Sequence, residues 1–201
     1  MISGSGKTVP EDTGTYPKSA LVTTDTEIES QSMVDYLCSC GHKRIAFITS
    51  RDEGLGRCHL NGYKRALEKN GLEYDEKLII RLKPAKRIYT IENGYNCTCE
   101  LLKSGVDFSC IYAISDTLAV GACRAIIDSG KRVPEDYCVA GADGQDIAEY
   151  YHPSITTLKY PRVETALQSV RTLFDLIDRK KVVKRQILGG TLIERESTRK
   201  L

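Results

Sequence analysis

Two kinds of hydrophobic pattern alternate along this chain. Short uninterrupted runs of apolar and β-branched residues, such as RIAFITS at residues 44–50, are typical of strands buried on both faces of a sheet. Elsewhere, apolar residues recur every three or four positions, as in NGYKRALEKNGL at 61–72, and this spacing predicts amphipathic helices. Helices are predicted at residues 27–40, 57–72, 91–105, 116–130 and 162–181. Strands are predicted at residues 44–50, 108–115, 136–143 and 154–161, near Lys77–Leu82, and as two short segments within 185–197.

The alternation of strands and helices predicts an α/β fold, with a parallel sheet flanked by helices. In such sheets, ligands bind beyond the carboxyl ends of the strands. Polar residues follow predicted strands at Arg57–His59, Ser115, Asp116 and Asp143, so these positions are candidates for a binding site. We expect Asp116 to cap the helix that it begins, because an acid there accepts hydrogen bonds from free backbone N–H groups.

The first twenty residues are rich in Gly, Ser, Thr and Pro and show no periodicity. They are interpreted as a flexible segment or a tag remnant. SGSGKT resembles the end of a phosphate-binding loop, but that motif needs a glycine where this chain has Met1, after a strand. A nucleotide site is therefore not predicted there.

Composition and charge exclude several classes of function. The chain has 201 residues and a net charge of only +2, from 29 basic and 27 acidic residues, which disfavours nucleic-acid binding by the chain itself. The sequence shows neither a stretch of ~20 apolar residues nor a basic–apolar leader, so a membrane span and secretion are not predicted.

The eight cysteines and three histidines predict no catalytic or metal centre. CSC and CTC fall within predicted helices, where residues two apart point in different directions and cannot share a metal. Reduced cysteines serving as small core residues are the favoured interpretation, with a disulfide or zinc framework as the alternative. With no carboxylate pair or nucleophile–base set evident either, we predict no enzyme, metal or cofactor.

Five segments in order resemble the effector-binding region of the LacI/GalR family of bacterial transcriptional regulators. They are GHKRIAFI, NGYKRALEKNGL, SDTLAVGACRAIIDSGKRVPEDYCVAGADG, YHPSITTLKYP and LIERES, and the resemblance runs from about Val22 to Ser197. It implies a periplasmic-binding-protein-like fold of type I, with two α/β subdomains joined by three crossing strands. A small effector, a sugar or a purine, binds between them, the domains form homodimers, and a helix-turn-helix headpiece reads the operator DNA.

Aligned with that family, the chain lacks the headpiece and most of the N-terminal subdomain, so the fold is mainly that of the C-terminal subdomain. The expected parts are a flexible segment (1–20), the last helix of the N-terminal subdomain (21–41), the C-terminal effector-binding subdomain (42–154), a crossover with a returning helix (155–181) and strands of the C-terminal subdomain (182–201). Helix 162–181 carries a continuous apolar stripe, which in the family packs on the N-terminal subdomain. We therefore expect that helix to be repacked, to sit against a partner chain, or to leave an exposed apolar patch.

The resemblance also implies effector-binding residues, each with a simpler alternative. His59 stands three residues before Gly62, where the family has an arginine; it either binds effector or is an ordinary helix residue. Arg57 either replaces that arginine or is solvated. Ser115 occupies the place of a family asparagine, and Asp143 that of an acidic ligand. Tyr89 lies near a family aromatic that stacks on the effector but is as readily a core or surface tyrosine, and Asp25 is an acid bordering the cleft or a loop acid.

The sequence therefore predicts a cytoplasmic effector-sensing domain that binds a small molecule and controls DNA binding through a headpiece outside this chain. Two alternatives remain open. One is the sugar-binding protein of a transporter, which shares the fold. The other is a dimerisation module without a ligand, which the departures at His59 and Ser115 favour.

Overall fold

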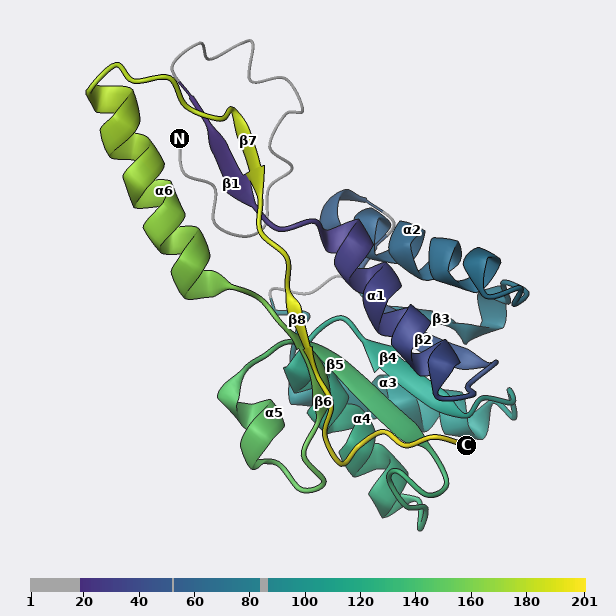
Figure 1. The fold of residues 1–201 in the computed structure, drawn as a ribbon. Coiled ribbons are helices and arrows are strands. Elements are labelled where there is room, and N and C mark those ends of the chain that lie inside the picture. Colours follow the sequence, from purple (N-terminus) through teal and green to yellow (C-terminus); the bar gives the residue numbers. More distant parts are fainter. Residues whose placement is uncertain (1–18, 52, 84–86) are drawn as a thin grey trace.

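The computed structural model describes residues 19–51, 53–83 and 87–201. The predicted flexible segment at 1–20 lies almost entirely outside the described residues. The remaining chain forms one large sheet, one small sheet and helices packed around them (Figure 1).

The large sheet has six strands in the order β3-β2-β4-β5-β6-β8. All neighbours from β3 to β6 are parallel, and β8 runs antiparallel to β6 at the edge. The four interior strands consist mostly of buried residues, as expected for strands covered on both faces. The bounds are β2 Ile45–Thr49, β3 Ile79–Arg81, β4 Cys110–Ala113, β5 Cys138–Asp143, β6 Thr156–Lys159 and β8 Thr191–Ile193. The predicted α/β class with a parallel sheet is confirmed.

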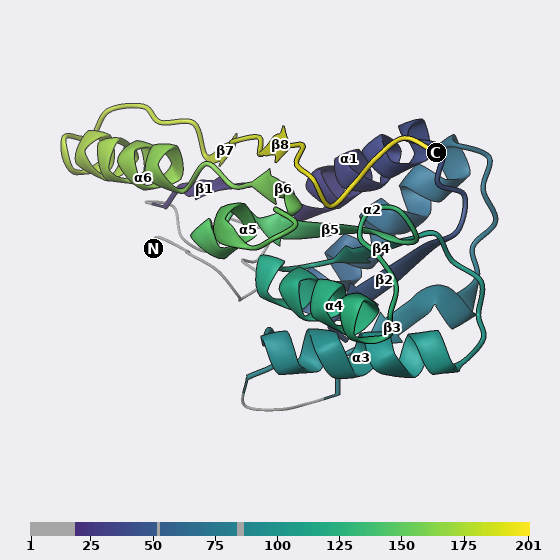
Figure 2. The ribbon, with the colours of Figure 1, turned by 90° about the horizontal axis from the view of Figure 1, so that it is seen from below.

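Helices cover both faces of this sheet. Helices α1 (Thr26–Ser39) and α2 (Gly54–Lys69) pack together on one face, and α3 (Ile91–Lys103) and α4 (Asp116–Asp128) on the other (Figure 2). Tyr63 of α2 stacks on Phe47 of β2 with ring centroids 4.9 Å apart. Gly62 allows the close approach of α1, because a Cβ there would lie 2.2 Å from the carbonyl oxygen of Glu27.

A small parallel sheet pairs β1 (Leu21–Thr23) with β7 (Arg185–Ile187). Helix α6 (Arg162–Ile177) lies beside it, away from the large sheet, and Gln186 of β7 bonds to Gln168 and Thr172 of that helix (Figures 1 and 2). Residues 182–201 were expected to belong with the large sheet. Strand β8 pairs with it and Ser197 is hydrogen-bonded to Val139 of β5, but β7 does not join it. The backbone of β7 instead pairs with β1, whose sequence, only three residues long, carries too little pattern to predict a strand. The short helix α5 (Asp146–Tyr150) escaped prediction for the same reason.

The apolar stripe of α6 faces outward. Polar Ser169 and Thr172 are buried on the side of the helix toward the small sheet, whereas the large apolar side chains are exposed. The exposed set is Val163, Leu167, Val170, Leu173, Phe174 and Ile177, from 42% to 67% accessible. Within the described chain the stripe is not repacked but exposed, so a partner chain against it stays a prediction.

Candidate functional site

Three parallel strands end beside one another and bring polar residues to the carboxyl edge of the large sheet. Thr49 ends β2, Ser115 follows β4, and Asp143 ends β5. Pairing of β4 with both β2 and β5 places these ends at one edge. The sequence therefore assembles, from three separate segments, the edge where α/β folds bind ligands.

Asp143 is the most accessible of these three residues and has the most unusual backbone. Its φ of 105° is rare for a residue with a side chain, and it turns the chain together with Gly144, whose φ is 63°. One carboxylate oxygen accepts a hydrogen bond from Gln145 Nε2 at 2.9 Å, and the carbonyl oxygen accepts one from Arg162 Nη2 at 3.2 Å. Burial raises the pKa of the partly exposed carboxyl.

Ser115, not Asp116, caps α4. The Ser115 hydroxyl accepts a hydrogen bond from the backbone N–H of Leu118 at 3.3 Å. Asp116 is fully buried, where its carboxylate accepts hydrogen bonds from the Thr157 hydroxyl and the Gln145 N–H, both at 2.6 Å. Burial raises its pKa to about 6. The expectation that Asp116 caps the helix is wrong, because its side chain turns inward and ties α4 to β6 and to the turn after β5.

His59 lies on the side of α2 that faces the sheet. Its residue is 7% accessible, and burial lowers its pKa to about 4, so the imidazole is neutral at pH 7. Its Nδ1 has no hydrogen-bond partner among the described residues, and neither has the buried hydroxyl of Thr49. Thr49 lies two positions beyond Phe47, and His59 one turn before Tyr63, which stacks on Phe47. Both therefore extend the same layer toward the carboxyl edge, one from the strand and one from the helix.

The other predicted residues are scattered around this edge. Tyr89 is 47% accessible, and its carbonyl oxygen accepts a hydrogen bond from the Thr117 hydroxyl, which also contacts Ser115 Oγ at 3.0 Å. Arg57 is exposed. Asp25 caps α1, accepting hydrogen bonds from the backbone N–H groups of residues 27 and 28. Within the described ranges, Thr117 connects Tyr89 to Ser115 by hydrogen bonds, and Gln145 connects Asp143 to Asp116. In the same ranges, no hydrogen bond joins Arg57 or Asp25 to these residues.

Glu29 is a buried acid that the sequence interpretation missed. The neighbouring apolar Ile28 is 56% accessible, whereas Glu29 is only 5% accessible. Glu29 stands one turn before the fully buried Met33, and that spacing was the available signal. Burial raises its pKa to about 7.

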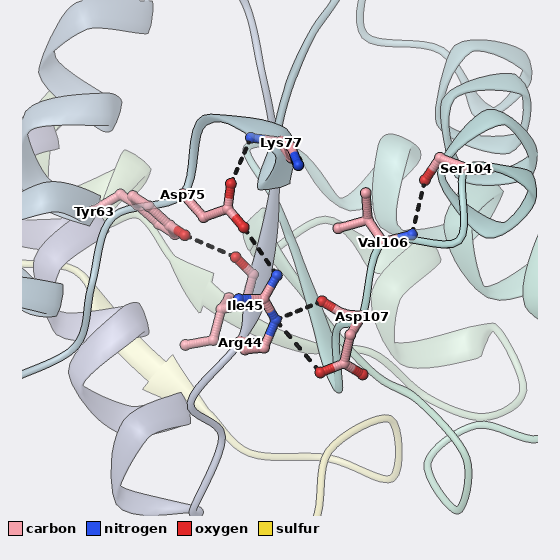
Figure 3. Close-up of polar contacts among 8 residues, drawn as sticks. All are labelled: Arg44, Ile45, Tyr63, Asp75, Lys77, Ser104, Val106 and Asp107. Carbon is pink, nitrogen blue, oxygen red and sulfur yellow. Dashed lines mark hydrogen bonds and ion pairs between the residues drawn. The ribbon is translucent and has the colours of Figure 1, made fainter.

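At the opposite edge of the sheet, the polar groups satisfy one another (Figure 3). Arg44 donates to Asp75 Oδ2 at 2.9 Å and to the carbonyl oxygen of Asp107 at 2.8 Å. Asp75 also accepts from the N–H of Lys77, and Tyr63 donates to the carbonyl oxygen of Ile45 at 2.8 Å. The Arg44 guanidinium holds the pKa of Asp75 below its usual value. Among the described residues, this cluster of side chains is hydrogen-bonded within itself, although Nε2 of the buried His42 at the same edge has no partner.

The described residues form neither a metal site nor a membrane span. In the part of the chain that the structure describes, no cluster of three or more His, Cys, Asp and Glu residues is placed to hold a metal ion. The eight cysteines are free thiols. Among the described helices, none is long and apolar enough to cross a membrane.

Comparison with known proteins gives this arrangement a family. Residues 34–198 match the periplasmic binding protein-like domain. The chain belongs to that family. It is 41% identical over 146 residues to the transcriptional regulator MalR of Clostridium butyricum, covering 73% of this chain and 42% of MalR. It is also similar in structure to a sugar-binding LacI-family regulator from Escherichia coli complexed with phosphate (TM-score 0.82, 32% identity, 90% of this chain and 64% of that one). A CelR–cellobiose complex gives a TM-score of 0.81 at 31% identity, covering 94% and 56%.

These matches confirm the predicted resemblance to LacI-family effector-binding domains. The chain spans about half the length of the curated relatives that it matches. Those relatives are transcriptional regulators and not enzymes, in agreement with the prediction from the sequence. None of the matches tests which residues of this periplasmic binding protein-like domain contact an effector, so the six candidate residues remain predictions.

Proposed function

We propose that this chain is the effector-sensing part of a LacI-type transcriptional regulator and that it binds a sugar or a purine-like metabolite at the carboxyl edge of its large sheet. The observation that carries the proposal is Asp143. Its carboxylate stands at the edge where three strands end, and a side chain of its own turn is the one hydrogen-bond partner described for it. Two carboxylate oxygens with free lone pairs are well suited to accept hydrogen bonds from adjacent hydroxyl or N–H groups of a ligand.

The other candidate residues take different parts in this proposal. Tyr89 offers an exposed aromatic face for stacking on a ring. His59 is neutral and buried, so it supplies one acceptor and one donor but not the charged fork of an arginine. Ser115 already caps α4, so we assign it a contact through its second lone pair only. Arg57 and Asp25 lie at the rim, where they contact a bound molecule only from the side.

Regulation would follow from a shift between two arrangements of the small sheet, with α6, relative to the large sheet. An effector that binds one arrangement more tightly raises its population by the ratio of the two affinities. The relatives named as HTH-type transcriptional regulators support a headpiece as the part that reads operator DNA. We further propose a homodimer as the working unit and the cytoplasm as its location.

The exposed stripe of α6 favours the dimerisation module as a second candidate. Six large apolar side chains in water are costly, and a second copy of the chain would remove them from solvent. In this alternative the chain binds no effector. The transporter interpretation has no comparable support, because the named relatives are regulators.

A thermal-shift screen separates the two candidates. Cellobiose, maltose, ribose, adenine and hypoxanthine are each added to the chain, and a ligand at about ten times its Kd should raise the melting temperature by about 3–5 °C. Asp143→Asn, which tolerates the same backbone turn, should abolish that shift because the charged acceptor is lost. Asp146→Asn, an exposed acid three residues away, is the matched control and should keep it.

Two results would contradict the proposal. A shift that survives in Asp143→Asn would place the binding site elsewhere. No shift with any of these compounds, together with a concentration-dependent dimer in sedimentation, would favour the dimerisation module.

A further inference from the structure

The two sheets are connected by three short segments that lie together. Residues 24–25 lead from β1 to α1, residues 160–161 from β6 to α6, and residues 188–190 from β7 to β8 (Figure 1). Any change in the angle between the small sheet and the large one must bend these segments. Glu29, in the first turns of α1, is packed at this junction.

The geometry around Glu29 involves all three segments. Thr24 and the backbone N–H of Gly190 act to lower the pKa of Glu29, but neither makes a well-formed hydrogen bond to its carboxyl group. A Cβ at Gly190 would lie 3.0 Å from Glu29 Oε1, so the carboxyl group is pressed against that segment. Tyr160 is close enough for the Glu29 charge to raise its pKa. Both carboxyl oxygens are buried without a partner among the described residues.

The described groups that face Glu29 supply no positive charge to stabilise its ionised form. The N-cap Asp25 adds a negative charge that raises the Glu29 pKa, and Tyr112 of β4 and Tyr160 after β6 are neutral phenols. Helix α2 packs beside it with the neutral His59, whose carbonyl oxygen accepts from Ser30 at 2.8 Å. No cation is among the groups that shift the pKa of Glu29, and burial, the largest cause, raises it to about 7.

We propose that Glu29 is a proton-linked switch at the junction of the two sheets. Protonated Glu29 is compatible with the closed packing of the three segments. Loss of its proton to solvent leaves a buried, unpaired carboxylate, which is relieved when the segments part and water reaches the two oxygens. Rising pH therefore favours an open junction. This switch requires no effector and stands whether or not the sensing function does.

The size of the effect follows from proton linkage. With a pKa of about 7 in the closed form and 4.5 in water, the ratio of open to closed junction rises roughly tenfold between pH 6 and pH 8. Hydrogen exchange of peptides covering residues 24–30, 158–162 and 188–192 measures this ratio, after division by the intrinsic exchange rate at each pH. The wild-type chain should lose protection in all three peptides together.

Glu29→Gln should remove that pH dependence, because the amide cannot ionise. Glu68→Gln, which changes an exposed glutamate on α2, is the matched control and should behave as wild type. Equal pH dependence in wild type and Glu29→Gln would overturn the proposal. If Glu29→Gln does not fold, a carboxyl ¹³C NMR titration of the wild-type chain decides: a Glu29 midpoint above 6 supports the switch, and any lower midpoint overturns it.

Discussion

The acidic side chains at the two edges of the large sheet are satisfied in opposite ways, although each edge also holds a buried histidine with a ring nitrogen that has no partner among the described residues. At the amino edge, Arg44, Asp75 and the carbonyl oxygens around them are hydrogen-bonded to one another, and the pKa of Asp75 is lowered by its partner. At the carboxyl edge, Glu29 and His59 are buried with unpartnered atoms, and burial shifts both pKa values toward the neutral forms.

This difference distinguishes residues that stabilise the fold from buried residues that carry another role. A paired polar group contributes to stability, whereas an unpaired buried one costs stability and persists only when the surrounding fold outweighs it. The same strands run from one edge to the other, so the hydrophobic pattern of the strands does not explain why their two ends differ. The carboxyl edge is where the family fold binds ligands and where the crossing segments pass.

The largest effect on stability is expected at Tyr63, a core residue of α2. Tyr63 stacks on Phe47 and donates a hydrogen bond to Ile45 at the amino edge. Tyr63→Ala should lower the free energy of unfolding by about 3–5 kcal/mol, because it leaves a cavity and an unpaired carbonyl oxygen. Urea denaturation measures this change. Tyr63→Phe, which keeps the ring, should cost only ~1 kcal/mol, and equal losses in the two variants would show that stacking contributes little.

The next largest effect is on the pH dependence of stability, to which Glu29 and His59 at the carboxyl edge contribute with opposite sign. Glu29 has a raised pKa in the folded chain, so its penalty is absent below pH 4.5 and grows until about pH 7. His59 has a lowered pKa, so its contribution is complete above pH 6.5 and is lost as pH falls to about 4. Each shift corresponds to about 3 kcal/mol at full extent.

Urea denaturation from pH 4 to pH 8 tests this pair. Relative to wild type, Glu29→Gln should gain stability as pH rises, and His59→Gln should lose it over nearly the same range. The sign of each change is the discriminating result. Parallel curves for wild type and either variant would mean that the corresponding group titrates alike in the folded and unfolded chain.

Much of this fold could be predicted from sequence, because its long elements carry strong periodicity. The helix at residues 116–130 and the buried strand at 108–115 were recognised from apolar spacing and helix-end residues alone. Strand β1 and helix α5 were not, because three to five residues do not define a period. The pairing of β7 with β1 depends on how distant segments cross, which no local pattern contains.

The candidate site was less predictable, for a related reason. Asp143 could be placed because it ends a buried strand. Ser115 and Asp116 are adjacent and both suit a helix start, so which one caps α4 depends on Thr157 and Gln145, which draw the Asp116 carboxylate inward. The burial of Glu29 depends on three crossing segments far apart in sequence.

The smallest effect is expected at the amino edge, where the ion pair is partly exposed. The side chains of Arg44 and Asp75 are 40% and 29% accessible, so water and salt screen their attraction. Arg44→Ala should lower the melting temperature by about 2 °C, and 0.5 M NaCl should reduce the difference from wild type. A loss as large as that of Tyr63→Ala would show that the hydrogen bond to the Asp107 carbonyl oxygen, which salt does not screen, fixes this edge. The paired edge would then be a cooperative network, whose members stabilise one another more than separate surface contacts do.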